Sequence, residues 1–236
     1  MRVLTDPLLR DRLAHLYRHA RRPDPKWVQA PDAVLLSHLH MDHCDFPSLR
    51  RLGSDIRLVV PRGAMSLMRR HGFRAVEELS PGESTAIGSV IVTATQAAHS
   101  GFRAPFGPMA SPVGFLLTGH LRIYFAGDTD LFPQMVELGP DLDVALLPIW
   151  GWGRKLGPGH LDPERAAEAL RMIRPSLAIP IHWGTLGTAG VNRRDPAFLS
   201  EPPLLFAQYA ARLAPDVVVR IVPPGECTRL DDLSVR

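Results

Sequence analysis

A short polar segment carrying four potential metal ligands follows the first apolar run of the sequence. It reads Ser37-His38-Leu39-His40-Met41-Asp42-His43 and comes directly after residues 33–36, whose apolar side chains predict a buried strand. Alternate residues at a strand end project to one side, so His38 and His40 can reach one ion while Asp42 and His43 face a second. Core packing gives no reason to gather such residues. The segment therefore predicts a metal site, and a histidine-rich loop that arose by chance is the alternative.

Three further residues of metal-binding types stand where other apolar runs end. His99 follows residues 90–98, Asp128 follows residues 123–127, and His182 follows residues 177–181. Loops after strand ends commonly carry functional groups. Taken singly, each residue has a structural alternative, either a satisfied buried histidine or a capping aspartate. The same placement repeated three times favours a shared site.

The elements that must position these residues are short and mixed in type. Asp45 and Asp162, each followed by proline, are predicted to cap helices. Hairpin-like pairs in the middle of the chain and strand–helix alternation towards its end predict an α/β fold in which helices cover sheets. The runs of strand length are 33–36, 56–60, 90–94, 113–117, 123–126, 144–147, 177–181 and 217–222, and the stretches of helical spacing are 47–52, 64–71, 131–138, 163–173 and 203–213.

Composition places the chain among globular proteins able to bury a core. It has 236 residues, of which 45% are hydrophobic and 22% are charged. We find no domain boundary and expect one domain over residues 1–236. No apolar run is long enough to predict a transmembrane segment or a signal peptide, and two cysteines cannot form a disulfide framework, so we expect a cytoplasmic protein.

The positive charge of the chain is concentrated at its beginning. The net charge is +3, and residues 1–30 carry seven basic against three acidic residues, a balance of +4 that leaves −1 for the rest. Because the chain after residue 30 is nearly neutral, it produces no broad positive potential that would attract a polyanion. No nucleic-acid partner is therefore expected. We interpret the Arg- and His-rich stretch within residues 1–30 as a solvated helix face, with a phosphate or an anionic membrane surface as the alternative contact.

The pattern His38-x-His40-x-Asp42-His43 resembles the HxHxDH motif of the metallo-β-lactamase-fold hydrolases. The resemblance spans nearly the whole chain and implies a four-layer αββα sandwich with two metal ions. It also implies that His38, His40 and His99 hold one ion, that Asp42, His43 and His182 hold the other, and that Asp128 bridges the two.

Three further segments resemble one branch of that superfamily, which contains N-acyl-phosphatidylethanolamine-hydrolysing phospholipase D and L-ascorbate-6-phosphate lactonase. They are residues 125–129, 159–164 and 181–185. Members of this branch usually begin with two additional strands ahead of the segment that reads Leu4-Thr5-Asp6-Pro7 here. We therefore expect either a start codon set too late or a first sheet that lacks its edge strands. The second case favours a homodimer, because an open strand edge pairs readily with another chain.

The resemblance and the ligand set together predict a binuclear metal-dependent hydrolase. Its nucleophile would be a metal-bridging hydroxide, and its substrate a phosphodiester or a small phosphorylated ester or lactone, which includes lipid-like molecules. Zinc is the first choice of metal, with manganese or iron as alternatives. Asp42 is expected to orient the proton of the nucleophile, and His160 to bind the substrate anion or protonate the leaving group.

Two other functions remain open from the sequence. One is a metal-dependent nuclease of the same fold, and the other is a metal-binding protein without turnover. Peripheral contact with a membrane is compatible with the basic N-terminal stretch. Cys44 adjoins a predicted ligand, but we expect it to be a small buried side chain outside the site.

Overall fold

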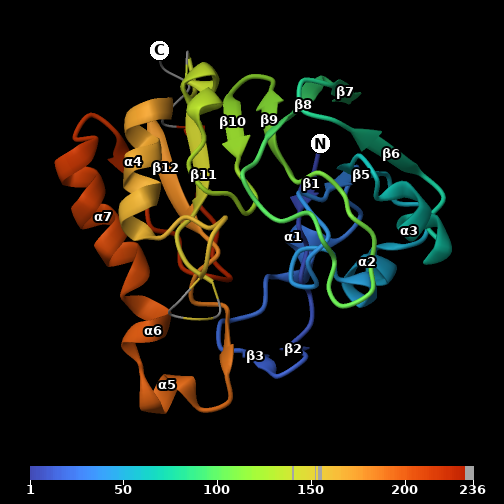
Figure 1. The fold of residues 1–236 in the computed structure, drawn as a ribbon, viewed down its shortest axis with the longest axis horizontal. Coiled ribbons are helices and arrows are strands. Elements are labelled where there is room, and N and C mark those ends of the chain that lie inside the picture. Colours follow the sequence, from blue (N-terminus) through green and yellow to red (C-terminus); the bar gives the residue numbers. More distant parts are fainter. Residues whose placement is uncertain (140, 152, 154–155, 232–236) are drawn as a thin grey trace.

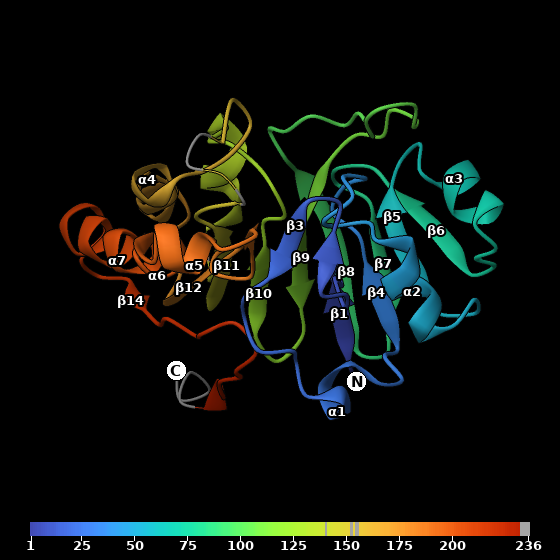
Figure 2. The same ribbon diagram turned by 90° about the horizontal axis from the view of Figure 1, so that it is seen from below.

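Two β-sheets pack face to face, with helices on the outer face of each (Figures 1 and 2). The computed structural model describes residues 1–139, 141–151, 153 and 156–231. A buried apolar layer lies between the sheets and includes Leu35, Val59, Val92 and Phe115. Separate apolar clusters lie between each sheet and its helices. The predicted αββα sandwich is confirmed.

The first sheet is parallel and has the strand order β1-β4-β5-β6. Side chains alternate along its strands, so Leu35 faces the second sheet while Val34 and Leu36 face the helices. Its strands are β1 (Val3–Thr5), β4 (Ala33–Leu35), β5 (Leu58–Pro61) and β6 (Val76–Leu79), and its helices are α2 (Phe46–Leu52) and α3 (Met65–Arg70).

The second sheet is mixed and has the order β14-β12-β11-β10-β9-β8-β7. Strands β7 to β10 form an antiparallel meander, and β10, β11, β12 and β14 are parallel. The strands are β7 (Ser84–Ile87), β8 (Val90–Gln96), β9 (Val113–Thr118), β10 (Arg122–Phe125), β11 (Val144–Pro148), β12 (Leu177–Ile181) and β14 (Val218–Val219). Helices α4 (Pro163–Ile173) and α7 (Pro202–Leu213) cover its outer face.

A third, small sheet joins the start of the chain to its C-terminal part. Strand β3 (Leu16–Arg18) pairs with β2 (Arg12–Leu13) and with β13 (Leu186–Thr188). The predicted helix face within residues 1–30 is therefore wrong. Prolines at positions 7, 23 and 25 interrupt any long helix there. Only α1 (Pro25–Val28) is helical in this stretch.

Most of the predicted elements are present with small changes at their ends. The stretch 131–138 forms a 3₁₀ helix, η1 (Pro133–Leu138), and the run 217–222 contributes only β14. Strands β1, β2, β3, β6, β7 and β13 were not predicted, and neither were α1, α5 (Val191–Arg194) and α6 (Ala197–Ser200). None of the helices in the described part of the chain is long and apolar enough to cross a bilayer.

The carboxyl ends of the parallel strands in both sheets point to one end of the sandwich. His38 follows β4, Asp128 follows β10, and His182 follows β12. Gly127 has a φ of +60°, and a Cβ there would lie 2.5 Å from the Cβ of Ser37, so glycine lets the loops after β10 and β4 pack closely. His182 itself has a φ of +62°, an uncommon backbone conformation for a non-glycine residue.

Asp45 fixes the helix that follows the histidine-rich loop. Its carboxylate accepts hydrogen bonds from the backbone N–H and hydroxyl of Ser48, at 3.0 and 2.6 Å, and so caps α2 as predicted. Arg10 adds a bidentate pair at 3.0 and 2.6 Å. Asp45 is buried, whereas the Arg10 side chain is 32% exposed.

We expect Asp45→Ala to lower the free energy of unfolding by about 2–4 kcal/mol, because it removes a helix cap and leaves Arg10 without its partner. Denaturant unfolding of the purified variant measures this difference. The matched control is Asp55→Ala, which breaks an exposed pair with Arg74 and should leave stability nearly unchanged. Equal effects of the two substitutions would contradict the role given to Asp45.

Candidate metal centre

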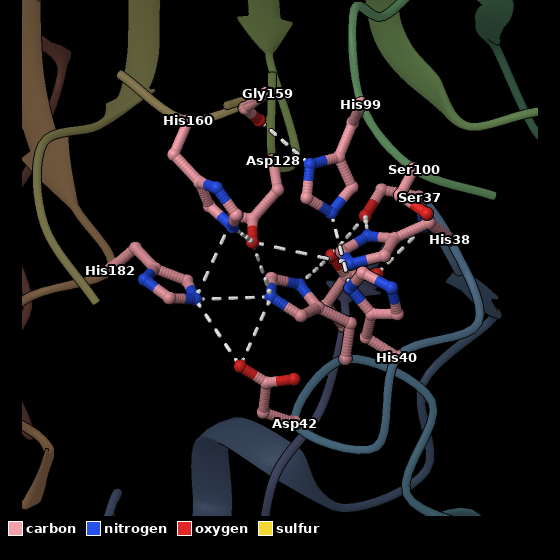
Figure 3. Close-up of polar contacts among 12 residues, drawn as sticks. Ser37, His38, His40, Asp42, His99, Ser100, Asp128, Gly159, His160 and His182 are labelled. Carbon is pink, nitrogen blue, oxygen red and sulfur yellow. Dashed lines mark hydrogen bonds and ion pairs between the residues drawn. The ribbon is translucent and has the colours of Figure 1, made fainter. Parts of the chain in front are cut away.

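The structure brings all eight predicted site residues to one place between the ends of the sheets (Figure 3). The loop after β4 supplies four of them, and the loops after β8, β10 and β12 supply one each. His160 comes from the segment before α4. The eight residues are His38, His40, Asp42, His43, His99, Asp128, His160 and His182.

The potential ligand atoms fall into two compact groups. In one, His38, His40 and His99 place one nitrogen each within 4.8 Å of one another. In the other, Asp42, His43 and His182 do the same. These are the two triads that the resemblance implied. Two further combinations satisfy the same distance limit, namely Asp6 with His38 and His43, and Asp128 with His99 and His160.

Asp128 lies between the two triads. Its Oδ2 is 3.2 Å from His43 Nε2 and 4.0 Å from His38 Nε2, and its Oδ1 is 3.6 Å from His182 Nε2. The side chain is buried, so its carboxylate is held among imidazole nitrogens and not in bulk water. One carboxylate thus faces a member of each group.

Hydrogen bonds on the far side of three rings decide which nitrogens face inward. The Nδ1 atoms of His99 and His182 lie 2.7 and 2.8 Å from the carbonyl oxygens of Gly159 and Trp150, which can only accept. His43 Nδ1 lies 2.8 Å from the Asp6 carboxylate, which also accepts. In a neutral imidazole the second nitrogen then carries a lone pair. In the neutral form that binds a metal ion, all three Nε2 atoms therefore present lone pairs to the centre.

This arrangement fits divalent cations. The Nε2 atoms of His43 and His182 are 3.0 Å apart, and two lone pairs so close repel unless a cation or a proton lies between them. His38 Nε2 is buried and has no hydrogen-bond partner in the described part of the chain. Inward lone pairs on imidazole together with carboxylate oxygens are the donor set that Zn²⁺ prefers, and the same set also suits manganese and iron.

The charges at the centre are strongly coupled. Burial alone would raise the pKa of Asp128, but the imidazoles of His182 and His43 outweigh it and hold that pKa well below its usual range. Burial works against protonation of His43, yet Asp128 and Asp42 raise its pKa well above normal. Burial lowers the pKa of His99 to about 4. The carboxylates thus stay ionised and favour positive charge beside them.

Asp6 orients residues of the centre through hydrogen bonds, and no local pattern in the sequence predicts this role. Its carboxylate accepts from the backbone N–H of Ser37 at 2.7 Å, from the Ser37 hydroxyl at 2.5 Å, and from His43. Because the Ser37 hydroxyl donates to Asp6, it accepts from His38 Nδ1 at 2.9 Å. Asp6 therefore fixes the orientation of two histidines, one from each triad.

Arg103 fixes the histidine-rich loop from the other side. Its guanidinium donates to the carbonyl oxygens of Leu39 and Cys44 and lies 4.8 Å from the centre of the Phe46 ring.

Cys44 is fully buried, and burial raises the pKa of its thiol to about 12, so it stays a neutral core side chain as expected. His15 differs from its predicted place on a solvated helix, because it lies in the β2–β3 turn and lines a hollow beside the centre.

Comparison with known proteins identifies the family of the chain. Residues 1–183 match the family described as the beta-lactamase superfamily domain. A UPF0173 metal-dependent hydrolase of Thermoplasma acidophilum is 30% identical over 197 residues, which cover 82% of this chain and 80% of the relative. The chain belongs to the β-lactamase superfamily, as one of its metal-dependent hydrolases. The resemblance drawn from the HxHxDH motif is confirmed.

Two other similar proteins are informative, one for the branch of the superfamily and one for the fold. The mitochondrial N-acyl-phosphatidylethanolamine-hydrolyzing phospholipase D of Saccharomyces cerevisiae is 33% identical over 219 residues, which cover 83% of this chain and 46% of the yeast protein. The structure of Igni18, a metallo hydrolase from Ignicoccus hospitalis, superposes with a TM-score of 0.63 at 26% identity, covering 83% of this chain and 78% of that one.

We expect Asp6→Asn to weaken metal binding about 10- to 100-fold, since the amide no longer provides the charged acceptor that orients His43. Competition with a chelating dye measures the affinity. Asp32→Asn is the control, because Asp32 is exposed and its carboxylate accepts a hydrogen bond from the backbone N–H of Arg2, away from the centre. Unchanged metal affinity in Asp6→Asn would show that the negative charge of Asp6 does not contribute to metal binding.

Proposed function

We propose that this protein is a binuclear hydrolase in which His38, His40 and His99 hold one divalent ion, Asp42, His43 and His182 hold the other, and Asp128 bridges them. The proposal rests on one observation. Two triads of ligand atoms, each compact enough for one ion, lie on either side of a single buried carboxylate. Zinc is the preferred metal because the first shell is rich in imidazole.

Two divalent ions in this setting would supply Lewis acidity and a hydroxide nucleophile at neutral pH. The protein's own groups do the rest. Asp42 Oδ2 lies 3.6 Å from both His43 Nε2 and His182 Nε2, which places it at the edge of the centre. From there it can accept a hydrogen bond from the attacking water and fix its direction. The ionised state of Asp42, held by a strongly lowered pKa under the influence of His43 and His182 despite burial, suits that task.

His160 is placed to act on the substrate. Its Nε2 is 3.8 Å from Asp128 Oδ2, its ring packs edge-on against His99 at 4.7 Å between centroids, and its Nδ1 is buried without a hydrogen-bond partner among the described residues. We propose that this imidazole binds a substrate oxygen and gives a proton to the leaving group.

The chemistry of the centre and one relative support the proposed substrate class. Two cations held by these residues would supply stabilisation of negative charge on phosphoryl or carbonyl oxygens. The yeast relative is named for hydrolysing N-acyl-phosphatidylethanolamine. We propose a phosphodiester or a small phosphorylated ester or lactone as substrate, lipid-like molecules included. A cytoplasmic location and a homodimer stay predictions.

Removal of metal should abolish hydrolysis of bis-p-nitrophenyl phosphate and also destabilise the fold. An ion present at about 100 times its dissociation constant adds about 2.7 kcal/mol, which corresponds to about 5–10 °C in Tm for a chain of this length. Activity and thermal melting before and after EDTA, with zinc added back, measure both effects. A chelated protein that melts at the same temperature would contradict the proposal.

We expect Asp42→Ala and His182→Ala to lose activity and to lower the metal content from two ions per chain. Metal analysis after dialysis, run beside the assay, measures both. The matched control is His120→Ala, because His120 lies exposed in the β9–β10 turn and should change neither quantity. Two ions per chain retained in both site variants would refute the ligand assignment.

His160→Gln separates a role on the substrate from a role as ligand. We expect kcat to fall about 10²- to 10⁴-fold while the metal content is unchanged, because a proton donor is lost but both triads stay intact. His120→Gln is the control. A parallel loss of metal would instead assign His160 to the group that it forms with His99 and Asp128.

A further inference from the structure

Exposed apolar side chains gather beside the candidate metal centre, in residues 101–110, which we call the projecting loop. Phe106 is 97% exposed, Met109 is 67% exposed, and Phe102 is exposed as well. Met41 of the histidine-rich loop is also exposed, and together with Ala104 it lines the hollow that lies between the centre and the β2–β3 turn. The projecting loop therefore reaches the rim of a hollow that opens on the centre.

Backbone contacts hold the projecting loop in a hairpin. Phe102 and Met109 form an antiparallel bridge, the backbone N–H of Arg103 donates to Pro108 O at 3.2 Å, and that of Gly107 donates to Arg103 O at 2.8 Å. Figure 2 shows the segment between β8 and β9 extending away from the sheets towards α3. The hairpin thus holds its apolar side chains in solvent, which is unfavourable unless another surface covers them.

Two short helices near the projecting loop add positive charge without negative charge. Helix α2 carries Arg50 and Arg51, α3 carries Arg69 and Arg70, and neither helix contains an acidic residue. All four arginines are exposed. Arg50 donates to an imidazole nitrogen at 3.1 Å and Arg51 donates to a backbone carbonyl oxygen, so these bonds leave both charges unneutralised.

The arginines and the projecting loop meet around one pair of stacked rings. Phe46 and His71 stack at 3.5 Å between centroids, and the guanidinium of Arg103 lies over the Phe46 ring. Burial and the charges of Arg50, Arg103 and Arg70 lower the pKa of His71. Guanidinium groups from α2, α3 and the projecting loop therefore lie close together, and they border the exposed hydrocarbon.

The basic residues near the start of the chain are less available to an anionic partner. Three of them pair with carboxylates, and a fourth, Arg18, donates to two backbone carbonyl oxygens. The pairs are Arg10 with Asp45, Arg22 with Asp11 and Lys26 with Asp24. The arginines of α2 and α3 are therefore better placed to contact an anionic surface than the stretch 1–30.

We propose that the projecting loop and the arginines of α2 and α3 form one surface that binds an anionic lipid bilayer. Phe102, Phe106 and Met109 enter the boundary between headgroups and acyl chains, and the guanidinium groups contact lipid phosphates. Apolar side chains bordered by arginine match a surface whose hydrocarbon lies just beneath negative charge. A second copy of the chain is a poorer occupant, because it would bring like-charged arginines together.

Docking in this way brings the rim of the hollow, at Met41 and Ala104, to the lipid surface. The metal centre then lies close to any lipid-like molecule in that bilayer. Binding to the bilayer does not require turnover, so the proposal is tested separately from the proposed hydrolysis.

Flotation of the metal-loaded protein with lipid vesicles tests the proposal. We expect binding to mixed vesicles made of equal parts of phosphatidylcholine and phosphatidylglycerol, and much weaker binding to phosphatidylcholine alone. The protein should be released from the mixed vesicles as salt rises, because salt screens the arginine charges. Sedimentation velocity without vesicles gives the oligomeric state of the same protein.

Substitutions at exposed positions separate the apolar and the cationic contributions. Phe106→Ser should weaken binding to mixed vesicles about 10- to 100-fold, because the most exposed apolar side chain is lost. Arg70→Gln should weaken it about fivefold, the effect of one charge near a membrane surface. The matched controls are Leu204→Ser and Arg212→Gln, which lie exposed on α7 over the other sheet and should leave binding unchanged. Melting temperatures show whether each variant is folded.

A tryptophan at the projecting loop reports insertion directly. Relative to the unsubstituted protein, Phe106→Trp should add emission that shifts to shorter wavelength with mixed vesicles and is quenched by brominated acyl chains. Leu204→Trp is the control, and its added emission should show neither response.

Four results would overturn the proposal. The first is absence of binding to mixed vesicles, and the second is equal binding to phosphatidylcholine alone, which would remove the role of the arginines. The third is full binding by Phe106→Ser, which would place the contact elsewhere. The fourth is a dimer in sedimentation that Phe106→Ser dissociates, because the surface would then be an interface between copies of the chain.

Discussion

The buried carboxylate of Asp128 is the constraint on which the rest of the site depends. An ionised group without water is costly unless positive charge or donors surround it, and here imidazoles from two other loops do so. Those loops follow β4 and β12, whose carboxyl ends meet that of β10 at one end of the sandwich. The packing of two sheets thus places a negative charge among ligands that no short stretch of chain could gather.

The groups that accept hydrogen bonds from the outer nitrogens of the histidines are as important for metal binding as the histidines themselves. Asp6, Gly159 O and Trp150 O hold protons on the outer nitrogens, so the inner nitrogens present lone pairs. A cluster of imidazoles becomes a metal site only with such orientation, since a rotated ring would turn a proton towards the ion. Asp6 reaches the site because β1 pairs beside β4. The first residues of the chain therefore belong to the centre as well as to the sheet.

The sequence predicted the candidate ligands better than it predicted the residues that orient them. The HxHxDH motif is local, and His99, Asp128 and His182 each follow a recognisable apolar run. Asp6 acts across 37 positions on His43, a relation that no local pattern reveals. Strands β6 and β7 were missed because Val76–Leu79 and Ser84–Ile87 mix polar with apolar residues. Residues 1–30 were misread as helical because their charges suggested an exposed face, whereas buried Leu13 and Leu16 pair in a hairpin.

The central claim is that two ions share Asp128. Anomalous diffraction from crystals of the zinc-loaded protein, recorded on both sides of the zinc absorption edge, tests it most directly. The account predicts two peaks about 3.5–4 Å apart, with one beside His38, His40 and His99, the other beside Asp42, His43 and His182, and Asp128 in contact with both. A single peak, or peaks away from Asp128, would contradict it.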